Sequence, residues 1–317
     1  MTQRQPIQYT GVNISGGEWG YIKAKVDPVY GEHYVYPTEA EVDYFAGCGM
    51  NIFRIPFSWE IVQPEPLTDL VVVEIERIKA VVDYILAKGA VAVLDPHNFG
   101  NYFKETIGGP AVPTAWFADL WTRLATEFAY DARIWYGLIN EPFKQSAAEW
   151  LPIANAAVAA IRATGATNLI AVPGTNWDGA HSWLASGNDN LLGIVDPLSN
   201  WIVEAHQYVD DDSSGTHPEI VSVTIGSERL IQFTEWCREH GKQALLGEFG
   251  IPVVDGYAET IHDMIGYMEA NRDVWVAFTW WAAGAIWDNY MFACDPLEGG
   301  DESPLMTALR PHLQLAC

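Results

Sequence analysis

Residues 245–250 read Leu245-Leu246-Gly247-Glu248-Phe249-Gly250, an apolar stretch that runs directly into a single glutamate. A short apolar run that ends in a polar residue is typical of a buried strand reaching the edge of a sheet. The same pattern occurs about a hundred residues earlier, in Leu138-Ile139-Asn140-Glu141-Pro142. The two segments predict two buried strands, each with a glutamate at its C-terminal end.

These two strands belong to a pattern that repeats along the chain. Apolar or β-branched runs end near eight positions, at intervals of roughly 33–45 residues: Asn13, Pro56, Asp95, Asn140, Pro173, Gln207, Glu248 and Trp281. Such an interval holds one strand, one helix and two loops. Helical periodicity fills the intervals at 37–45, 70–87, 114–128, 147–163, 227–240, 257–269 and 304–313, with only a short candidate at 179–184. The pattern predicts an α/β fold, a single (β/α)8 TIM barrel that forms one domain over residues 1–317.

Composition limits the partners of this chain. It has 17 basic and 41 acidic residues, which gives a net charge of −24, and it contains no run rich in lysine or arginine. A strongly acidic protein repels other polyanions, so we expect no nucleic-acid partner and no anionic membrane surface. An uncharged polymer feels little of this field. We expect the protein to be a monomer.

Targeting and cysteine patterns concern the compartment. The N-terminal segment 1–9 has no apolar stretch of signal-peptide length, and the longest uncharged apolar run, 274–287, is shorter than the ~20 residues that span a bilayer. We expect a soluble protein that is secreted to the extracellular space after removal of a signal peptide. The cysteines, Cys48, Cys237, Cys294 and Cys317, are widely spaced, and we expect buried or free thiols.

Polar and aromatic residues recur at the predicted strand ends. In a parallel barrel these ends gather on one face, where barrel enzymes place their chemistry. Taken singly, a histidine there can be a satisfied core residue, an arginine a structural ion pair and a tryptophan plain packing. Their recurrence at corresponding positions instead indicates a functional site. Its candidate members are Asn13, Arg54, His97, Asn98, Asn140, Glu141, Trp177, His206, Tyr208, Glu248 and Trp281.

Two carboxyl groups at one rim define a chemistry. Cleavage of a glycosidic bond needs one carboxyl to protonate the leaving oxygen and one to attack the anomeric carbon. Two carboxylates about 5–5.5 Å apart repel each other as anions, so one keeps its proton and the two carboxyls take different roles. The working hypothesis from Glu141 and Glu248 is therefore a retaining glycosidase.

Five short segments resemble, in order along the chain, the signatures of glycoside hydrolase family five, whose members are mostly endo-acting β-glycanases on a TIM barrel. They are Phe53-Arg54-Ile55-Pro56, Asp95-Pro96-His97-Asn98, Asn140-Glu141-Pro142, His206-Gln207-Tyr208 and Gly247-Glu248-Phe249-Gly250. Segments 173–177, 212–217 and 281–284 are most similar to the endo-β-1,4-glucanase branch that includes fungal cellulases. The resemblance covers nearly the whole chain.

The resemblance implies a division of labour in the site. It implies Glu141 as the acid/base and Glu248 as the nucleophile of a cellulase that acts on β-glucan polysaccharides without cofactor or metal. The surrounding residues that we expect to bind substrate are Arg54, His97, Asn98, Asn140, Trp177, His206, Tyr208 and Trp281. Arg54 and Tyr208 would favour the charged form of Glu248, and Asn140 is suited to binding the sugar 2-hydroxyl.

Tryptophans supply candidate sugar platforms, because flat indole faces suit the C–H faces of β-linked glucose. We expect Trp281 on the non-reducing side of the cleaved bond and Trp177 on the other side, with Trp59 and Trp287 further out. By contrast, Trp116, Trp121, Trp135 and Trp150 lie within or beside helix and strand patterns and are expected in the core.

Other functions fit parts of the sequence. Fold and catalytic pair do not choose the polymer, so mannanase, xyloglucanase and β-1,3-glucanase activities are alternatives. A metal-dependent hydrolase could use Asp95, His97 and His206, but the chain lacks an H-E-x-x-H motif. A non-catalytic polysaccharide-binding barrel is a further alternative, which the presence of both glutamates disfavours.

Overall fold

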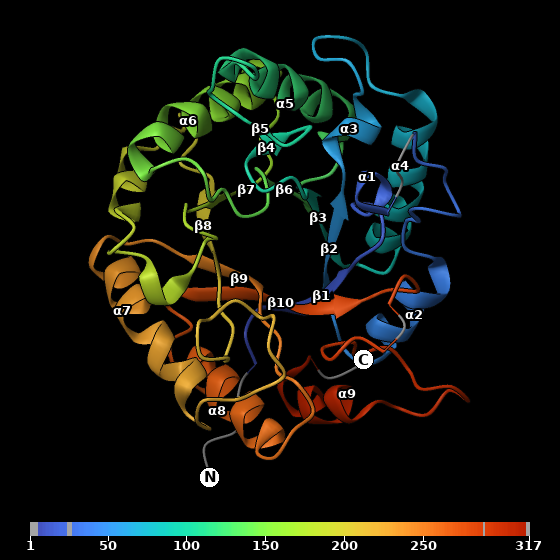
Figure 1. Cartoon of the computed structure of the whole chain (residues 1–317), viewed down its shortest axis with the longest axis vertical. Helices are drawn as coiled ribbons and strands as arrows, with labels where there is room; N and C mark the ends of the chain where they lie inside the picture. The colour runs from blue at the N-terminus through green and yellow to red at the C-terminus, as the bar shows by residue number, and fades with distance from the viewer. Residues whose placement is uncertain (1–5, 24–26, 288, 315–317) are drawn as a thin grey trace.

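The computed structural model describes residues 6–23, 27–287 and 289–314, and its centre is a closed barrel of eight parallel strands (Figure 1). The strands are β1 (Tyr9–Ile14), β2 (Ile52–Phe57), β3 (Val91–Pro96), β6 (Ile134–Gly137), β7 (Ile170–Pro173), β8 (Trp201–His206), β9 (Ala244–Glu248) and β10 (Trp275–Ala283). They close in the order β1-β10-β9-β8-β7-β6-β3-β2. Each matches a predicted strand, so the predicted TIM barrel is confirmed.

Helices form a ring outside the barrel (Figure 1). They are α2 (Glu39–Gly47), α4 (Val72–Ala87), α5 (Thr114–Phe128), α6 (Ala147–Ala163), α7 (Ile225–Glu239), α8 (Tyr257–Ala270) and α9 (Pro304–Leu309), which continues into the 3-10 helix η3 (Arg310–His312). Local sequence explains where two of them begin. Thr38 and Ser146 each accept a hydrogen bond from the backbone of a glutamate three residues later, which binds back in a capping box.

The connection after β7 departs from the pattern. Two 3-10 helices, η1 (Ala180–Ser182) and η2 (Asn188–Gly193), stand where a regular barrel has an α-helix, so the short candidate at 179–184 forms only a single turn. The segment 174–200 is rich in glycine, asparagine, aspartate and serine, whose side chains and backbone freedom favour turns over helix.

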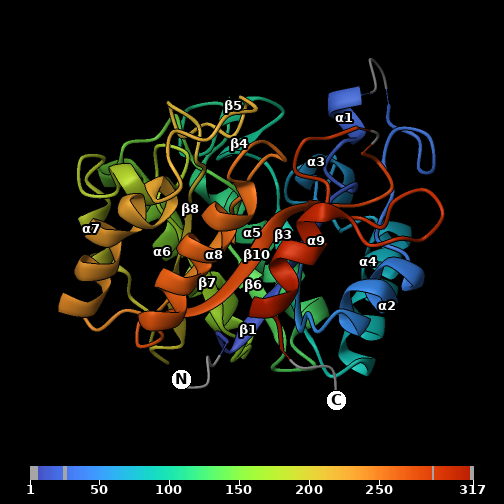
Figure 2. The same cartoon turned by 90° about the horizontal axis from the view of Figure 1, so that it is seen from below.

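Several short elements lie at one end of the barrel. They are α1 (Gly20–Lys23), α3 (Trp59–Val62) and a hairpin of β4 (Asn101–Tyr102) with β5 (Glu105–Thr106). Figure 2 shows α1 and the hairpin at the end opposite the chain termini. Because the hairpin follows the C-terminal end of β3, this end is the one that gathers the C-terminal ends of the strands.

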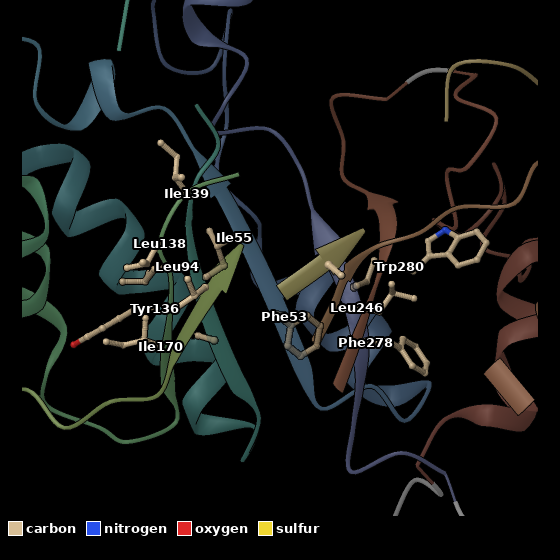
Figure 3. Packing of buried hydrophobic residues seen from close by; sticks show 14 of the residues in the cluster. Phe53, Ile55, Leu94, Tyr136, Leu138, Ile139, Ile170, Leu246, Phe278 and Trp280 are labelled. Atoms are coloured by element: carbon tan, nitrogen blue, oxygen red, sulfur yellow. The ribbon is translucent and has the colours of Figure 1, made fainter. Parts of the chain in front are cut away.

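Strand alternation separates two cores. Side chains that face outward, such as Phe53, Leu94 and Phe278, belong to the large cluster between the strands and the helices (Figure 3). A smaller cluster inside the barrel contains Ile52, Val91, Val93, Trp135, Ala171, Ile202, Leu245 and Ala277. Because side chains along a strand alternate with period two, the next residues on the inner face after Ile52 and Ile202 are Arg54 and Glu204. The barrel interior thus changes from apolar to charged toward its C-terminal end.

Three of the cysteines follow expectation. Cys48, Cys237 and Cys294 are buried free thiols, and Cys317 lies outside the described residues. Among the described helices, none combines the length and the apolar character needed to cross a membrane. That residues 1–317 act as one catalytic domain stays a prediction.

Candidate active site

The two predicted catalytic carboxyls face each other at the C-terminal end of the barrel. Glu248 is the last residue of β9, and Glu141 lies in the loop after β6. A carboxylate oxygen of each and a ring nitrogen of His206 all lie within 4.8 Å of one another. A separation of about 5–5.5 Å belongs to retaining glycosidases, whereas about 6.5–9.5 Å leaves room for the water of an inverting enzyme.

The backbone that presents Glu141 is unusual. β6 ends at Gly137, and the chain then stays beside the barrel because the Asn140 amide donates to the Pro96 carbonyl at 3.0 Å. Glu141 has φ +38°, in the left-handed region that costs most residues energy. Pro142 also disfavours the right-handed helical conformation at Glu141. The carboxyl is held by His206, whose Nδ1 lies 2.7 Å from Glu141 Oε1.

Glu248 has a donor on each carboxylate oxygen. Arg54 Nη1 donates to Oε1 at 3.0 Å, and Tyr208 Oη donates to Oε2 at 2.9 Å. Glu248 as a whole is only 4% exposed. Two donors, one on β2 and one in the segment after β8, fix the plane of the carboxylate, which orients it as a nucleophile requires.

Arg54 is the charge centre beneath the pair. Its guanidinium is 1% exposed and donates to Asn13 Oδ1 at 3.0 Å and to Asn140 Oδ1 at 2.8 Å. It also lies 2.9 Å from Asp95 Oδ2 and 3.1 Å from Glu204 Oε1. A buried cation needs such partners, because desolvation without them costs several kcal/mol.

Burial dominates the electrostatics of the nucleophile. Loss of water raises the pKa of Glu248, and Glu141 adds to the rise, while His206, Arg54 and His97 oppose it. The expectation that Arg54 favours the charged form of Glu248 did not include the effect of burial. The attraction of Arg54 is present, but removal of the carboxylate from water is the larger effect.

Both histidines of the site carry raised pKa values. Burial lowers the pKa of His206, but Glu248 and the hydrogen bond to Glu141 outweigh it and hold the pKa well above the ordinary value. Burial acts in the same direction on His97, and Asp95, 2.7 Å from its Nδ1, reverses the effect. The neighbouring acids therefore favour the imidazolium form of both histidines, beside the Arg54 guanidinium.

Aromatic residues lie close to the segments that carry the pair: the Trp281 amide donates to the Phe249 carbonyl at 2.9 Å and the Trp177 amide to the Pro142 carbonyl at 3.4 Å. Trp281 stacks on His97 with ring centroids 5.1 Å apart, and its peptide bond to Ala282 is cis. Trp177 is 48% exposed and stacks on Phe143 at 4.1 Å. The suggestion that Trp59 is a sugar platform is wrong, because it is fully buried. Trp287 lies edge-on to Trp281 at 6.1 Å.

Asn98 is placed differently from the other expected residues. Its Oδ1 accepts from the Trp59 amide at 2.8 Å, and its Nδ2 donates to Glu60 Oε2 at 2.6 Å. The amide therefore fastens the start of α3 to the loop after β3. That Asn98 also binds substrate stays a prediction.

Two buried acids of this region were missed from the sequence. Glu204 lies two residues before His206 on β8, and strand alternation could have identified it as inward-facing. Glycine at position 247 makes room for it, because a Cβ there would lie 2.3 Å from Glu204 Oε1. Glu18, in the loop after β1, accepts from the Gly16 amide at 2.7 Å, and burial raises its pKa. No pattern in the sequence marks Glu18.

The fold and the paired carboxyls define a class, a (β/α)8-barrel protein with a site of glycosidase type. More narrowly, the chain belongs to the cellulase family, glycosyl hydrolase family 5, whose family model matches residues 2–284.

Relatives and solved structures agree with this family. The chain is 39% identical to endo-beta-1,4-glucanase A of Emericella nidulans over 96% of this chain and 92% of that protein. It is 37% identical to the probable endo-beta-1,4-glucanase B of Neosartorya fischeri, over 97% of this chain and 92% of that one. The endo-beta-1,4-glucanase Xac0029 of Xanthomonas axonopodis pv. citri is 41% identical, with a TM-score of 0.94 over 98% of this chain and 99% of that chain. XacCel5A, whose structure holds cellopentaose, is similar at 41% identity and a TM-score of 0.94, over 96% and 99% of the two chains.

Proposed function

We propose that this protein is a retaining endo-β-1,4-glucanase that cleaves internal bonds of cellulose and related β-glucans. The observation that carries the proposal is the approach of the Glu141 and Glu248 carboxyls to within 4.8 Å. Membership of the cellulase family and the printed names of its relatives support the choice of substrate.

In the first step Glu248 attacks the anomeric carbon. Its carboxylate forms a covalent bond to the sugar as the glycosidic C–O bond breaks, and Glu141 gives its proton to the leaving oxygen. Arg54 and Tyr208 hold the two oxygens of Glu248 in position before attack. The charge on Glu248 is neutralised when the ester forms.

In the second step water cleaves the glycosyl ester. Glu141, now ionised, removes a proton from the water that attacks the anomeric carbon, and Glu248 leaves as a carboxylate. Two inversions at one carbon give net retention. Protonated His206, 2.7 Å from Glu141 Oε1, stabilises the anion that exists between the steps.

Asn140 has a free donor for the sugar. Its Oδ1 accepts from Arg54, while its buried Nδ2 has no partner among the described residues. A buried amide without a partner is costly, and a sugar hydroxyl satisfies it. We assign it to the 2-hydroxyl next to the reacting carbon, a contact that strengthens as the ring flattens toward the oxocarbenium ion.

The proposal extends to the location of the protein, its oligomeric state, its sugar platforms and its need for a metal. The protein acts outside the cell as a monomer on a neutral polymer, with Trp281 and Trp177 as sugar platforms on the two sides of the cut. It needs no metal. Dialysis against a chelator is expected to leave the rate unchanged, and loss of activity restored by a divalent cation would contradict this.

A substrate panel tests the polymer. Carboxymethylcellulose, lichenan, mannan, xyloglucan and laminarin are incubated with the enzyme, and new reducing ends are counted. We expect the fastest release from the two substrates with β-1,4-glucosidic bonds and unsubstituted backbone stretches, carboxymethylcellulose and lichenan. Preference for mannan, xyloglucan or laminarin would contradict the proposed substrate but not the proposed roles of the two catalytic glutamates.

The Glu248→Gln variant tests the pair. It keeps the size of the side chain and removes the nucleophile, so activity should fall by several orders of magnitude while the thermal unfolding temperature stays near that of the parent. Glu228→Gln, on the outer helix α7, is the matched control and should remain active.

A further inference from the structure

Tyr208, the donor to Glu248, has a ring that two other residues contact closely. Phe292 stacks on it with centroids 5.7 Å apart and an interplanar angle of 19°. Gly215 lies so near that an added Cβ would be 2.6 Å from Cδ1 and 2.7 Å from Cε1 of the ring. Real Cβ atoms do not approach so closely, so the tyrosine can occupy its position only because residue 215 has no side chain.

One buried carboxylate closes the loop that carries Gly215. Asp210 is 1% exposed, and its Oδ1 accepts from the Gly215 amide at 3.0 Å. Its Oδ2 accepts from Ser214 Oγ at 3.0 Å and from the Thr216 amide at 3.2 Å. Residues 210–217, called here the Asp210 loop, therefore fold around this carboxylate.

Helix α7 fastens the start of the loop. Arg229 Nη1 donates to the carbonyls of Tyr208 at 2.8 Å and Asp210 at 2.7 Å, and its Nη2 donates to the Asp211 carbonyl at 3.1 Å. A planar guanidinium that binds successive carbonyls fixes the backbone on both sides of residue 209. Both ends of the contact between Gly215 and Tyr208 are thus fixed.

A metal site is the other reading of this cluster, because ligand atoms of Asp210, Asp212 and His217 lie within 4.8 Å of one another. The Asp210 carboxylate has about four lone-pair sites. Its Oδ2 accepts from the Ser214 hydroxyl and from the backbone amides of residues 216 and 217, and His217 Nδ1 lies 3.2 Å from the same atom, while Oδ1 accepts from the amide of residue 215. The hydrogen bonds account for the cluster without an ion.

We propose that the Asp210 loop is a positioning device for the nucleophile, in which Gly215 acts through Tyr208 to hold the hydrogen bond to Glu248. Gly215 and Asp210 are positioning residues, since neither touches the carboxyl pair. The inference rests on the proposed function and deepens it, because it identifies what places the catalytic carboxylate.

The test compares Gly215→Ala with Gly241→Ala. Both glycines have positive φ, +68° and +61°, so both variants carry a similar backbone cost. The space around Gly241 is open, whereas the new methyl at 215 must displace the Tyr208 ring. We expect Gly215→Ala to lower kcat/KM on p-nitrophenyl cellobioside by about tenfold to a hundredfold, the worth of a hydrogen bond to a charged group. Gly241→Ala should stay within about twofold.

A double-mutant cycle with Tyr208→Phe asks whether the effect runs through the hydroxyl. If it does, Gly215→Ala costs at most about twofold more once the hydroxyl is gone. Additive losses, an unaffected Gly215→Ala enzyme or an unaffected Tyr208→Phe enzyme would each overturn the proposal. Asp210→Asn, which loosens the loop without adding atoms beside the ring, must show the same dependence on Tyr208, and it serves if Gly215→Ala does not fold.

Two further readouts distinguish positioning from general damage. Loss of a donor to the Glu248 anion raises the pKa of Glu248, so the acid limb of kcat/KM should move to higher pH in Gly215→Ala. The other charged groups that face Glu248 are unchanged in this variant: Arg54, His97, Glu141 and His206. Binding of cellotetraose to Gly215→Ala should match the parent. Each kcat/KM value is compared with that of the unmodified enzyme. An inactive unmodified enzyme would contradict the proposed function. An active one whose double-mutant cycle is additive would contradict only this inference.

Discussion

At the scale of single residues, the site is a balance of buried charges. Arg54 touches Asp95, Glu204 and Glu248 within 3.1 Å. His97 and His206, whose pKa values nearby acids raise, lie beside the catalytic carboxyls. The cations keep a buried carboxylate available for attack, although burial alone raises its pKa. Without Arg54 three buried acids would lose their cationic partner, so substitution of Arg54 should impair folding as well as catalysis.

The role of Glu141 gives a prediction at this scale. A proton donor matters less when the leaving group is a good one, because a stable anion can depart without protonation. Glu141→Ala should therefore lose about a hundredfold or more on cello-oligomers but much less in the first step on 2,4-dinitrophenyl cellobioside. Burst kinetics measures that step, and equal losses on both substrates would argue against proton donation.

At the scale of elements, period-two alternation builds the site. The inner faces of β2 and β8 carry an isoleucine near their start and Arg54 and Glu204 further along, so rigid strands deliver the charges. Loops add what strands cannot. The turn at residues 176–178, with three successive positive φ values, presents Trp177, and the Asp210 loop holds Tyr208.

The loop after β10 gives a prediction about stability. Burial raises the pKa of Asp295 to about 6, while the Gly284 amide opposes the rise. An acid whose folded pKa is raised stabilises the fold fully below its unfolded value, near 3.9, and this contribution disappears as pH rises through about 6. Asp295→Asn should therefore raise the free energy of unfolding at pH 7.5, by up to about 3 kcal/mol, and change little at pH 3.5. Thermal unfolding of the parent and of Asp295→Asn at the two pH values measures this difference, with exposed Asp301→Asn as the control. An equal effect of Asp295→Asn on stability at both pH values would contradict the prediction.

The sequence predicted the elements that repeat and missed those that do not. All eight barrel strands and the outer helices were located, because apolar runs and helical periods reflect burial directly. The helices α1 and α3 and the β4–β5 hairpin are too short for periodicity to detect. Trp59 was misjudged for a similar reason, since one tryptophan in a loop motif gives no sign of which way it faces. Expected neighbours such as Arg54 and Tyr208 do contact Glu248, whereas Glu18 lies in a loop without periodicity, so its burial could not be predicted.

At the scale of the whole molecule, charge acts over distance. With a net charge of −24 the enzyme repels a polyanion, and salt weakens this repulsion because the Debye length falls to about 10 Å at 0.1 M. Raising the ionic strength from 10 to 150 mM should therefore lower KM for carboxymethylcellulose and leave KM for neutral hydroxyethylcellulose unchanged. A parallel response of both substrates would assign the salt effect to the protein itself rather than to steering.

The central claim is that the carboxyls of Glu141 and Glu248 act on one bond by double displacement. Proton NMR of the first products from a cello-oligomer measures this most directly, because the anomeric signal records stereochemistry before mutarotation. Double displacement predicts that the β-anomer appears first and that the α-anomer increases later. Initial appearance of the α-anomer would contradict it, since a single inversion leaves no place for a covalent intermediate on Glu248.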